Sequence, residues 1–484
     1  MDIRRQVLSG LGWLVAGRGI VQAISWVATI YVIRLLQPED YGIVAVATVL
    51  FGLLVILCNA GLGSAIIVNK DIGRSKLQEF QGFLLFTSTV IGLLHLAAAP
   101  LLAKFFVEPR IEPVVRLLSL GFIFAAASIV PRALLTRKMQ FKRQAIATSI
   151  ATLIGTTVTV VLAVRGHAFW SLIIGQLATT LSLSIACMIA AKSWLLPRIP
   201  SRNTFELIAV GMSITASNAL WYIYTKLDVF IASRLWNSNI LGYYTVPLHL
   251  ARLPAGKVMP ILKKVALPSF AKLRDDRSAA AYYFRLSLSL GALAVFPVFF
   301  GIASVSPTAV PLVLGEKWIP STWILFVVCL GMPFNTLTGL FAPLLVATGN
   351  HATVLSNTTF ALMIFAVTFT VGAFIGPLGL AAAWALSFPV VFVMTSVRSA
   401  PKISVNLGSV FAAIRSPLFA ASAMLGANMA AYYFIAPETS PFLVLFLQIL
   451  LGAVVYFATI LLIDRKLVAK ALATVGIRRA TATP

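Results

Sequence analysis

The stretch PFLVLFLQILLGAVVYFATILLI, residues 441–463, contains no charged side chain. A helix needs about 20 predominantly apolar residues to cross roughly 30 Å of hydrocarbon, and this stretch is long enough. The charged tripeptide Asp464-Arg465-Lys466 follows directly and ends the apolar run. The sequence therefore predicts a transmembrane helix over residues 441–463.

Similar apolar blocks recur along the whole chain. The 484 residues are 60% hydrophobic and 11% charged, whereas a soluble domain is about 45–50% apolar and about 25% charged. We therefore predict an all-α integral membrane protein of about fourteen transmembrane helices. The predicted spans are 10–33, 41–66, 81–103, 114–134, 145–164, 168–191, 206–233, 240–262, 284–306, 321–347, 352–374, 377–397, 412–435 and 441–463.

The charges between these spans predict the orientation. The chain has 38 Lys+Arg and 14 Asp+Glu, a net charge of +24, and basic residues in short loops mark the cytoplasmic side. Placing both termini in the cytoplasm leaves few basic residues outside. These are Arg34, Lys104, Arg110, Arg116, Arg165, Arg234 and Lys317. This placement explains the positive charge without nucleic acid.

Several functional classes lack their sequence signals. Cys58, Cys187 and Cys329 lie far apart within predicted spans, so we expect packing residues instead of a disulfide or metal site. No G-x-x-x-x-G-K-[ST] loop occurs, and the predicted external loops are too short for a catalytic domain. The apolar run up to Ile33 is longer than a signal-peptide core, so it is kept as the first span. We expect a transporter without a cofactor, not an enzyme.

An internal repeat appears at an offset of 200 residues. Arg34-Leu35 matches Arg234-Leu235, and Gly42 matches Gly242. Transporters are often built from duplicated halves, so this pattern predicts a duplication.

Polar residues follow one face of the first span and one face of the seventh. They are Arg18, Gln22, Ser25 and Thr29 in the first span, and Thr215, Asn218, Tyr222 and Thr225 in the seventh. Unsatisfied polar groups facing lipid cost several kcal/mol each. The two stripes therefore either line a wet cavity or hold helices together by hydrogen bonds.

Charged residues inside spans are costly and need a specific role. Basic residues outnumber the single acid, Asp228, which favours an anionic cargo. The basic residues within spans are Arg18, Lys226, Arg252 and Lys257. A diphosphate group with attached sugars fits this pattern, because cations bind phosphate and hydroxyls or amides replace water around sugars.

The eighth span combines polar and helix-breaking residues. Pro247, Pro254 and Pro260 predict an interrupted helix that lines a cavity, with His249 and Arg252 on one face. Lys257 has the alternative of snorkelling to the interface, and His249 is either a proton relay or a packing residue. Asp228 is expected in ion coupling or a structural pair. The predicted substrate-binding set is Arg18, Gln22, Ser25, Asn218, Tyr222, Lys226, His249, Arg252 and Lys257.

Two blocks of sequence resemble Wzx-type polysaccharide flippases. The first is Arg34-Leu35-Leu36-Gln37-Pro38-Glu39-Asp40-Tyr41-Gly42, followed by Asn59-Ala60-Gly61-Leu62-Gly63-Ser64-Ala65. The second comprises Leu227-Asp228, Leu241-Gly242-Tyr243-Tyr244, Leu267-Pro268-Ser269-Phe270, Arg274-Asp275-Asp276 and Leu314-Gly315-Glu316-Lys317-Trp318. The resemblance covers most of the chain, although the last two spans carry little of it.

This resemblance implies the multidrug/oligosaccharidyl-lipid/polysaccharide exporter fold, with two pseudo-symmetric six-helix lobes around a central cavity and two further helices. The corresponding ranges are 1–191 for the first lobe, 192–205 for a cytoplasmic linker, 206–397 for the second lobe, 398–463 for the extra helices and 464–484 for a basic cytoplasmic tail. It also implies a bacterial inner-membrane protein. Its implied cargo is an undecaprenyl-diphosphate-linked oligosaccharide, with polysaccharide polymerase and export machinery as further partners.

Other functions share the predicted fold or its location. A peptidoglycan-precursor flippase and a multidrug antiporter would have the same helices. A membrane glycosyltransferase or polymerase would need acid or base groups near an aqueous face, and the short external loops disfavour it.

Overall fold

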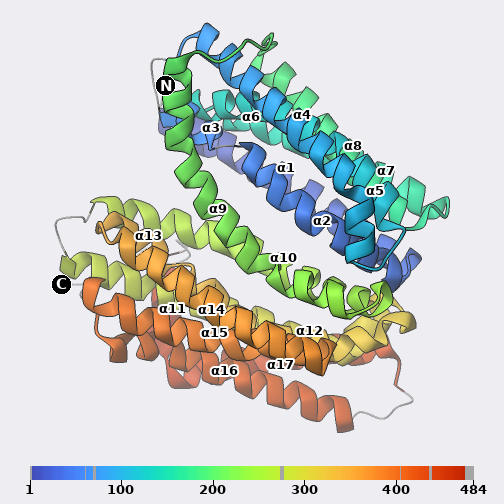
Figure 1. Cartoon of the computed structure of the whole chain (residues 1–484). Helices are drawn as coiled ribbons and strands as arrows, with labels where there is room; N and C mark the ends of the chain where they lie inside the picture. Colours follow the sequence, from blue (N-terminus) through green and yellow to red (C-terminus); the bar gives the residue numbers. More distant parts are fainter. Residues whose placement is uncertain are drawn as a thin grey trace. The chain divides into compact units, whose positions relative to one another are not determined.

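The computed structural model describes residues 3–59, 61–68, 72–272, 277–403, 405–434 and 439–474. Within these ranges, the side chains of 3–18, 64–65, 68, 202–214, 217, 257–272, 277–280, 351 and 474 lie outside the description. Every regular element of the described chain is a helix (Figure 1).

Eleven helical segments of the described chain are long and apolar enough to cross a membrane. They are Pro38–Asn59, Arg74–Phe105, Ile111–Arg137, Phe141–Val164, Ala168–Ala191, Ala281–Leu314, Glu316–Ala347, Ala352–Ile375, Pro377–Ile403, Leu407–Phe434 and Pro441–Ile463. Helices α1 (Ile3–Leu35), α9 (Arg202–Leu235) and α10 (Ser238–Lys272) are also long, but many of their side chains lie outside the description. The all-α membrane fold is confirmed, and the number fourteen stays a prediction.

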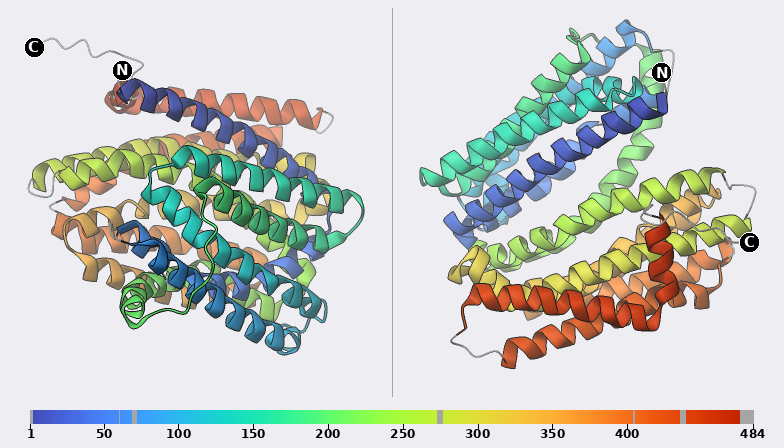
Figure 2. Two further views of the ribbon diagram at one scale, coloured as in Figure 1. Left: turned by 90° about the horizontal axis from the view of Figure 1, so that it is seen from above. Right: turned by 180° about the vertical axis from the view of Figure 1, so that it is seen from behind.

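Residues Met1–Gly242 form one compact unit. After α1, its helices are α2 (Pro38–Asn59), α3 (Leu62–Val68), α4 (Arg74–Phe105), α5 (Ile111–Leu118), α6 (Leu120–Arg137), α7 (Phe141–Val164), α8 (Ala168–Ala191) and α9. Helix α7 packs along both α1 and α8, and α9 packs along α2 (Figures 1 and 2). Phe51, Phe122 and Ile173 form part of a buried core that joins α2, α6 and α8.

Residues Tyr243–Pro484 form the second compact unit. After most of α10, it contains α11 (Arg277–Ala309), η1 (Val310–Leu314), η2 (Glu316–Ser321), α12 (Thr322–Thr338), α13 (Phe341–Ala347), α14 (His351–Ile375), α15 (Pro377–Ser399), η3 (Ala400–Ile403), α16 (Leu407–Phe434), α17 (Pro441–Ile463) and α18 (Arg465–Thr474). Helix α11 packs against α12 and α16. Tyr456 of α17 donates a 2.8 Å hydrogen bond to the Leu293 carbonyl of α11.

Two helices bear on the sequence-based predictions. Helix α17 covers the predicted span 441–463 from end to end. In contrast, α10 is continuous from Ser238 to Lys272, so the prediction of an interrupted eighth span is wrong. A proline removes one backbone hydrogen bond, and a long helix can continue past that loss with local adjustment.

The predicted lobe boundaries stay predictions. Helix α9, which begins the second predicted lobe, packs against α2, α3 and α4. The first compact unit accordingly extends to Gly242.

Candidate functional site

The turn between α1 and α2 is fixed by a buried carboxylate. Asp40 is 8% exposed and accepts hydrogen bonds from the Gln37 backbone N–H at 2.8 Å and the Phe169 N–H at 3.1 Å. The second bond satisfies a backbone donor in the first turn of α8. Asp40 thus ties the α1–α2 turn to the start of α8.

A charged network lies beside this turn, in the α4–α5 connection. Arg110 Nε donates to Glu108 Oε1 at 2.8 Å, and its guanidinium also pairs with Glu39 of α2. Ser238 at the start of α10 donates to Glu108 Oε2 at 2.8 Å. The Arg110 guanidinium holds the pKa of Glu108 below its ordinary value of 4.5, and Ser238 acts in the same direction. We call Glu39, Glu108, Arg110 and Ser238 the external network, because the predicted topology places them outside.

The same region brings the repeated glycines together. A Cβ at Gly42 would lie 1.8 Å from the Ser238 carbonyl oxygen, and a Cβ at Gly242 would lie 1.7 Å from the Pro38 carbonyl oxygen. Only glycine permits such backbone contacts. The contact is reciprocal at the 200-residue offset, since Pro38 corresponds to Ser238 and Gly42 to Gly242. This geometry supports the predicted duplication of a helix hairpin.

Thr215, Asn218 and Trp221 of helix α9 line a polar pocket. The pocket has a volume of about 440 Å³ and is open to the surface. Its polar lining comprises Asn59, Arg132, Thr136, Gln144, Thr215 and Asn218, and Trp221 contributes an aromatic ring. Arg132 and Gln144 come from α6 and α7, so three distant segments supply a cation, amides and hydroxyls to one space.

Further along α9, the surroundings become apolar. A second pocket of about 470 Å³ lies between α2, α4 and α9. It is lined by Val49, Leu50, Leu53, Leu102, Phe105, Phe106, Tyr222, Ile223, Lys226, Leu227 and Phe230. Lys226 is the one charged group of this lining. Tyr222 also donates to the Val49 carbonyl at 3.0 Å, so it holds α9 against α2 as well as facing the pocket.

The polar stripe of α1 is only partly described. Gln22 and Ser25 are half-buried, and the Ser25 hydroxyl is a buried group without a hydrogen-bond acceptor or donor in the described chain. The side chain of Arg18 lies outside the described residues. A cavity role for this stripe therefore stays a prediction.

In the second unit, Arg252 lies beside an aromatic residue. Its guanidinium carbon is 5.4 Å from the centre of the Trp384 ring, within the range of a cation–π interaction. The Trp384 indole N–H donates to the Tyr244 hydroxyl at 2.7 Å, so α15 and α10 together fix this ring.

The remaining predicted site residues have separate environments. His249 is exposed on α10, and Asp228 is fully buried on α9. The side chain of Lys257 lies outside the described residues. The structure thus places Asn218, Tyr222 and Lys226 along pockets of the first unit and Arg252 against Trp384 in the second. Their convergence on one chamber stays a prediction.

The sequence analysis did not predict the residues from other helices that line the polar pocket together with α9. Arg132, Asn59 and Gln144 lie close to predicted loops, where basic and polar residues are usual. Nothing in their spacing along the sequence indicates that they line the same pocket as Asn218. Trp384 was also missed, because one aromatic residue in an apolar helix carries no functional signal.

Comparison with known proteins identifies the family. A family model described as "Polysaccharide biosynthesis protein" matches residues 31–322, more than half of the chain. The chain belongs to this polysaccharide biosynthesis family. It is similar to the lipopolysaccharide biosynthesis protein WzxC of Escherichia coli (strain K12), with 27% identity over 354 residues, 70% of each chain. It is also similar to the succinoglycan biosynthesis transport protein ExoT of Rhizobium meliloti (strain 1021), 23% identical over 354 residues, 72% of this chain and 70% of ExoT.

A solved structure supports the fold independently. The lipid II flippase MurJ, in an inward closed conformation, matches with a TM-score of 0.73 and covers 93% of this chain and 99% of its own. The sequence identity is 15%, so this likeness concerns the fold. Together the comparisons confirm the resemblance to Wzx-type flippases and the prediction of a multi-pass membrane transporter instead of an enzyme.

Proposed function

We propose that this family member flips undecaprenyl-diphosphate-linked oligosaccharide repeat units from the cytoplasmic to the periplasmic leaflet of a bacterial inner membrane. Family membership and the transporter fold support movement of a lipid-linked polysaccharide precursor. The observation that carries the proposal within this chain is the pair of pockets along α9. One is polar and contains a cation, and the other is apolar with a single amine.

These pockets match an amphipathic cargo. Asn218 in the polar lining and Lys226 in the apolar lining are eight residues apart, which is about 12 Å along a helix. Arg132 supplies a charge for phosphate, amides and hydroxyls can bind sugars, and Trp221 offers a flat surface for a sugar ring. The apolar pocket offers a surface for part of a hydrocarbon chain. A small drug cation would need no such combination.

The transport route requires more than one helix. In the proposal, two lobes, about 1–191 and 206–397, open alternately to each side around a cationic chamber. Arg18, Lys226, Arg252 and Lys257 attract the diphosphate, whereas Gln22, Ser25, Asn218 and Tyr222 bind sugar hydroxyls. His249 and the buried Asp228 are candidates for ion coupling.

The proposed direction of transport goes with one orientation of the chain in the membrane. Both termini lie in the cytoplasm, and the external network of Glu39, Glu108, Arg110 and Ser238 lies in the periplasm. The product reaches the periplasmic face, where a polymerase and export machinery would act on it.

Deletion of the gene tests the proposed cargo. The expected result is loss of a surface or secreted polysaccharide together with accumulation of its lipid-linked repeat unit, identified by mass spectrometry. Restoration by the wild-type gene and by Lys142→Ala, an exposed site outside both α9 pockets, controls for expression. Accumulation of peptidoglycan precursor, or drug sensitivity with normal polysaccharide, would instead support one of the other cargoes.

A further inference from the structure

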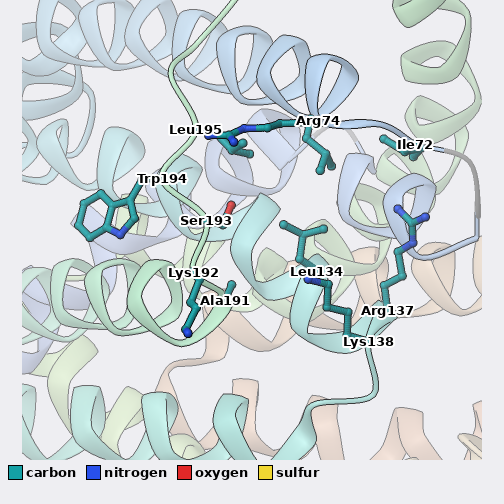
Figure 3. Close-up of a pocket in the computed structure, with 11 residues that line it drawn as sticks. Ile72, Arg74, Leu134, Arg137, Lys138, Ala191, Lys192, Ser193, Trp194 and Leu195 are labelled. Atoms are coloured by element: carbon teal, nitrogen blue, oxygen red, sulfur yellow. The ribbon is translucent and has the colours of Figure 1, made fainter.

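A separate basic pocket lies at the predicted cytoplasmic end of the first unit. It has a volume of about 540 Å³ and is lined by Ile72, Arg74, Leu77, Leu134, Arg137, Lys138, Ala191, Lys192, Ser193, Trp194 and Leu195. These residues come from the start of α4 and the residues just before it, the end of α6, and the end of α8 with the segment that follows it (Figure 3). Four cations surround the space, and the described lining residues include no carboxylate.

Part of this charge has a structural explanation. Arg137 and Lys138 lie at the end of α6, and Lys192 follows the end of α8, where cations interact favourably with the helix dipole. Arg74 does not fit that explanation, because it is the first residue of α4. That first turn has no acid, and Gly73 supplies no capping side chain. A cation at a helix N-terminus opposes the dipole, whereas a bound anion would satisfy both the helix and Arg74.

Ser193 provides an independent indication of a polar ligand. The residue is 6% exposed, and its hydroxyl is a buried group without a hydrogen-bond partner in the described chain. It lies between the basic side chains in the pocket lining (Figure 3). Buried hydroxyls are normally hydrogen-bonded, so an anionic ligand oxygen here would satisfy Ser193 and lie among basic side chains.

The wall formed by the α8–α9 connection is firmly attached. Its Arg198 N–H donates to the Gln78 carbonyl of α4 at 3.1 Å, and Ser201 donates to Glu79. A Cβ at Gly82 would lie 2.0 Å from the Arg198 carbonyl oxygen. Because Gly82 permits this close approach, the connection lies against α4 at Arg198. At the other end, the Ser193 N–H donates to the Met188 carbonyl at 3.1 Å.

The apolar surroundings indicate that the anion belongs to a lipid. Trp194, Leu196 and Ile199 in the same connection are 63%, 76% and 92% exposed, and tryptophan is enriched at membrane–water interfaces. Leu77, Leu134 and Leu195 form an apolar side of the pocket. We propose that this pocket binds the phosphate headgroup of an anionic membrane phospholipid in the cytoplasmic leaflet, at a site distinct from the α9 pockets. The proposal does not depend on the identity of the cargo.

Phosphatidylglycerol is a suitable probe for the full-length protein in phosphatidylcholine nanodiscs. We expect it to raise the thermal stability of the protein and to be retained in native mass spectra, with both effects weakened at high salt because the contacts are ionic. Inorganic pyrophosphate should stabilise much less. An equal effect of pyrophosphate would show a site for free phosphate and overturn the lipid assignment.

Two pairs of variants that remove the same charge test whether phosphatidylglycerol binds in this pocket. Arg74→Gln with Lys138→Gln removes two pocket cations, and Lys142→Gln with Lys466→Gln removes two exposed cations outside the pocket lining. The pocket variant should bind phosphatidylglycerol roughly 30-fold more weakly, since each basic residue near a membrane surface contributes about a factor of five. It should remain at least as stable as wild type in phosphatidylcholine, because repulsion within the empty pocket is reduced.

A conservative change provides a second test. Ser193→Ala removes only the buried hydroxyl, and we expect weaker phosphatidylglycerol binding without loss of folding. Equal weakening by the pocket and control pairs would assign the effect to general surface charge and contradict the proposal. Unchanged binding by the pocket pair and by Ser193→Ala would contradict it as well.

Discussion

Arg252 has an aromatic partner within its own unit. In the predicted eighth span a charged residue costs about 2.5–3.5 kcal/mol on insertion scales, and the nearby Trp384 ring would offset part of that cost. Tyr244 accepts the Trp384 indole N–H, so a change at any of these residues affects the others. Arg252 therefore has a structural contact at this site, and its role in cargo binding stays a proposal.

Substitution of Arg252 separates these two roles. We expect Arg252→Ala to impair polysaccharide export at normal membrane abundance and to lower stability by about 1 kcal/mol, because the cation–π contact is lost. Arg252→Lys should retain more export, and the same order should hold for alanine and lysine at Arg18. Complementation of a deletion strain measures this, with the exposed Arg285→Ala as control. Full export by both Arg→Ala variants would remove these arginines from the site.

Glu108 predicts a dependence of stability on pH. Its pKa in the folded chain is lowered by Arg110 and Ser238, so its stabilising effect is present above about pH 4.5 and is lost as the pH falls through the lower folded pKa. Glu108→Gln should lower stability by at most about 1 kcal/mol at neutral pH, and the difference should disappear in acid.

Thermal unfolding between neutral pH and pH 3 checks this prediction about Glu108. Glu112→Gln is the matched control, because Glu112 pairs with Arg116 within a single helix. If wild type remained as much more stable than Glu108→Gln at pH 3 as at neutral pH, the predicted loss of the Glu108 contribution in acid would be contradicted.

The helices themselves were largely predictable from sequence. An uninterrupted apolar block such as 441–463 defines a helix by composition alone, and α17 has the same ends. The continuity of α10 was not predictable, because proline disfavours a helix locally while the surrounding chain decides whether the helix continues. The α9 pockets were found only in part, since Asn218 and Lys226 are conspicuous inside a span but Arg132 and Asn59 reach the polar pocket through tertiary packing.

The reciprocal contact of Gly42 and Gly242 gives a prediction for the helix hairpins. Gly42→Ala places a methyl group 1.8 Å from the Ser238 carbonyl oxygen, so the α1–α2 and α9–α10 turns must separate. We expect a loss of about 1–3 kcal/mol of stability, as for other overpacked sites, and reduced export.

Gly256→Ala is the control, because a Cβ at Gly256 would meet no atom within 4 Å. Thermal unfolding of both purified variants makes the comparison. Equal stability of the two variants would show that the turns do not need this close approach.

At the scale of the whole molecule, the central claim is that the chain itself moves a lipid-linked oligosaccharide across the bilayer. Family membership assigns it to polysaccharide biosynthesis, and its fold is similar to that of the lipid II flippase MurJ. The α9 pockets supply both polar and apolar surfaces for such a cargo. The claim requires that the purified protein translocates the lipid-linked oligosaccharide without any other transport protein.

Reconstitution into liposomes that carry the lipid-linked repeat unit measures this most directly. A membrane-impermeant glycosidase, enclosed within the vesicles, reports each sugar that reaches the inner leaflet. We predict protein-dependent cleavage of the outer-leaflet fraction, which Arg132→Ala and Arg252→Ala reduce and Lys142→Ala leaves unchanged. Cleavage that is the same with and without the protein would contradict the account.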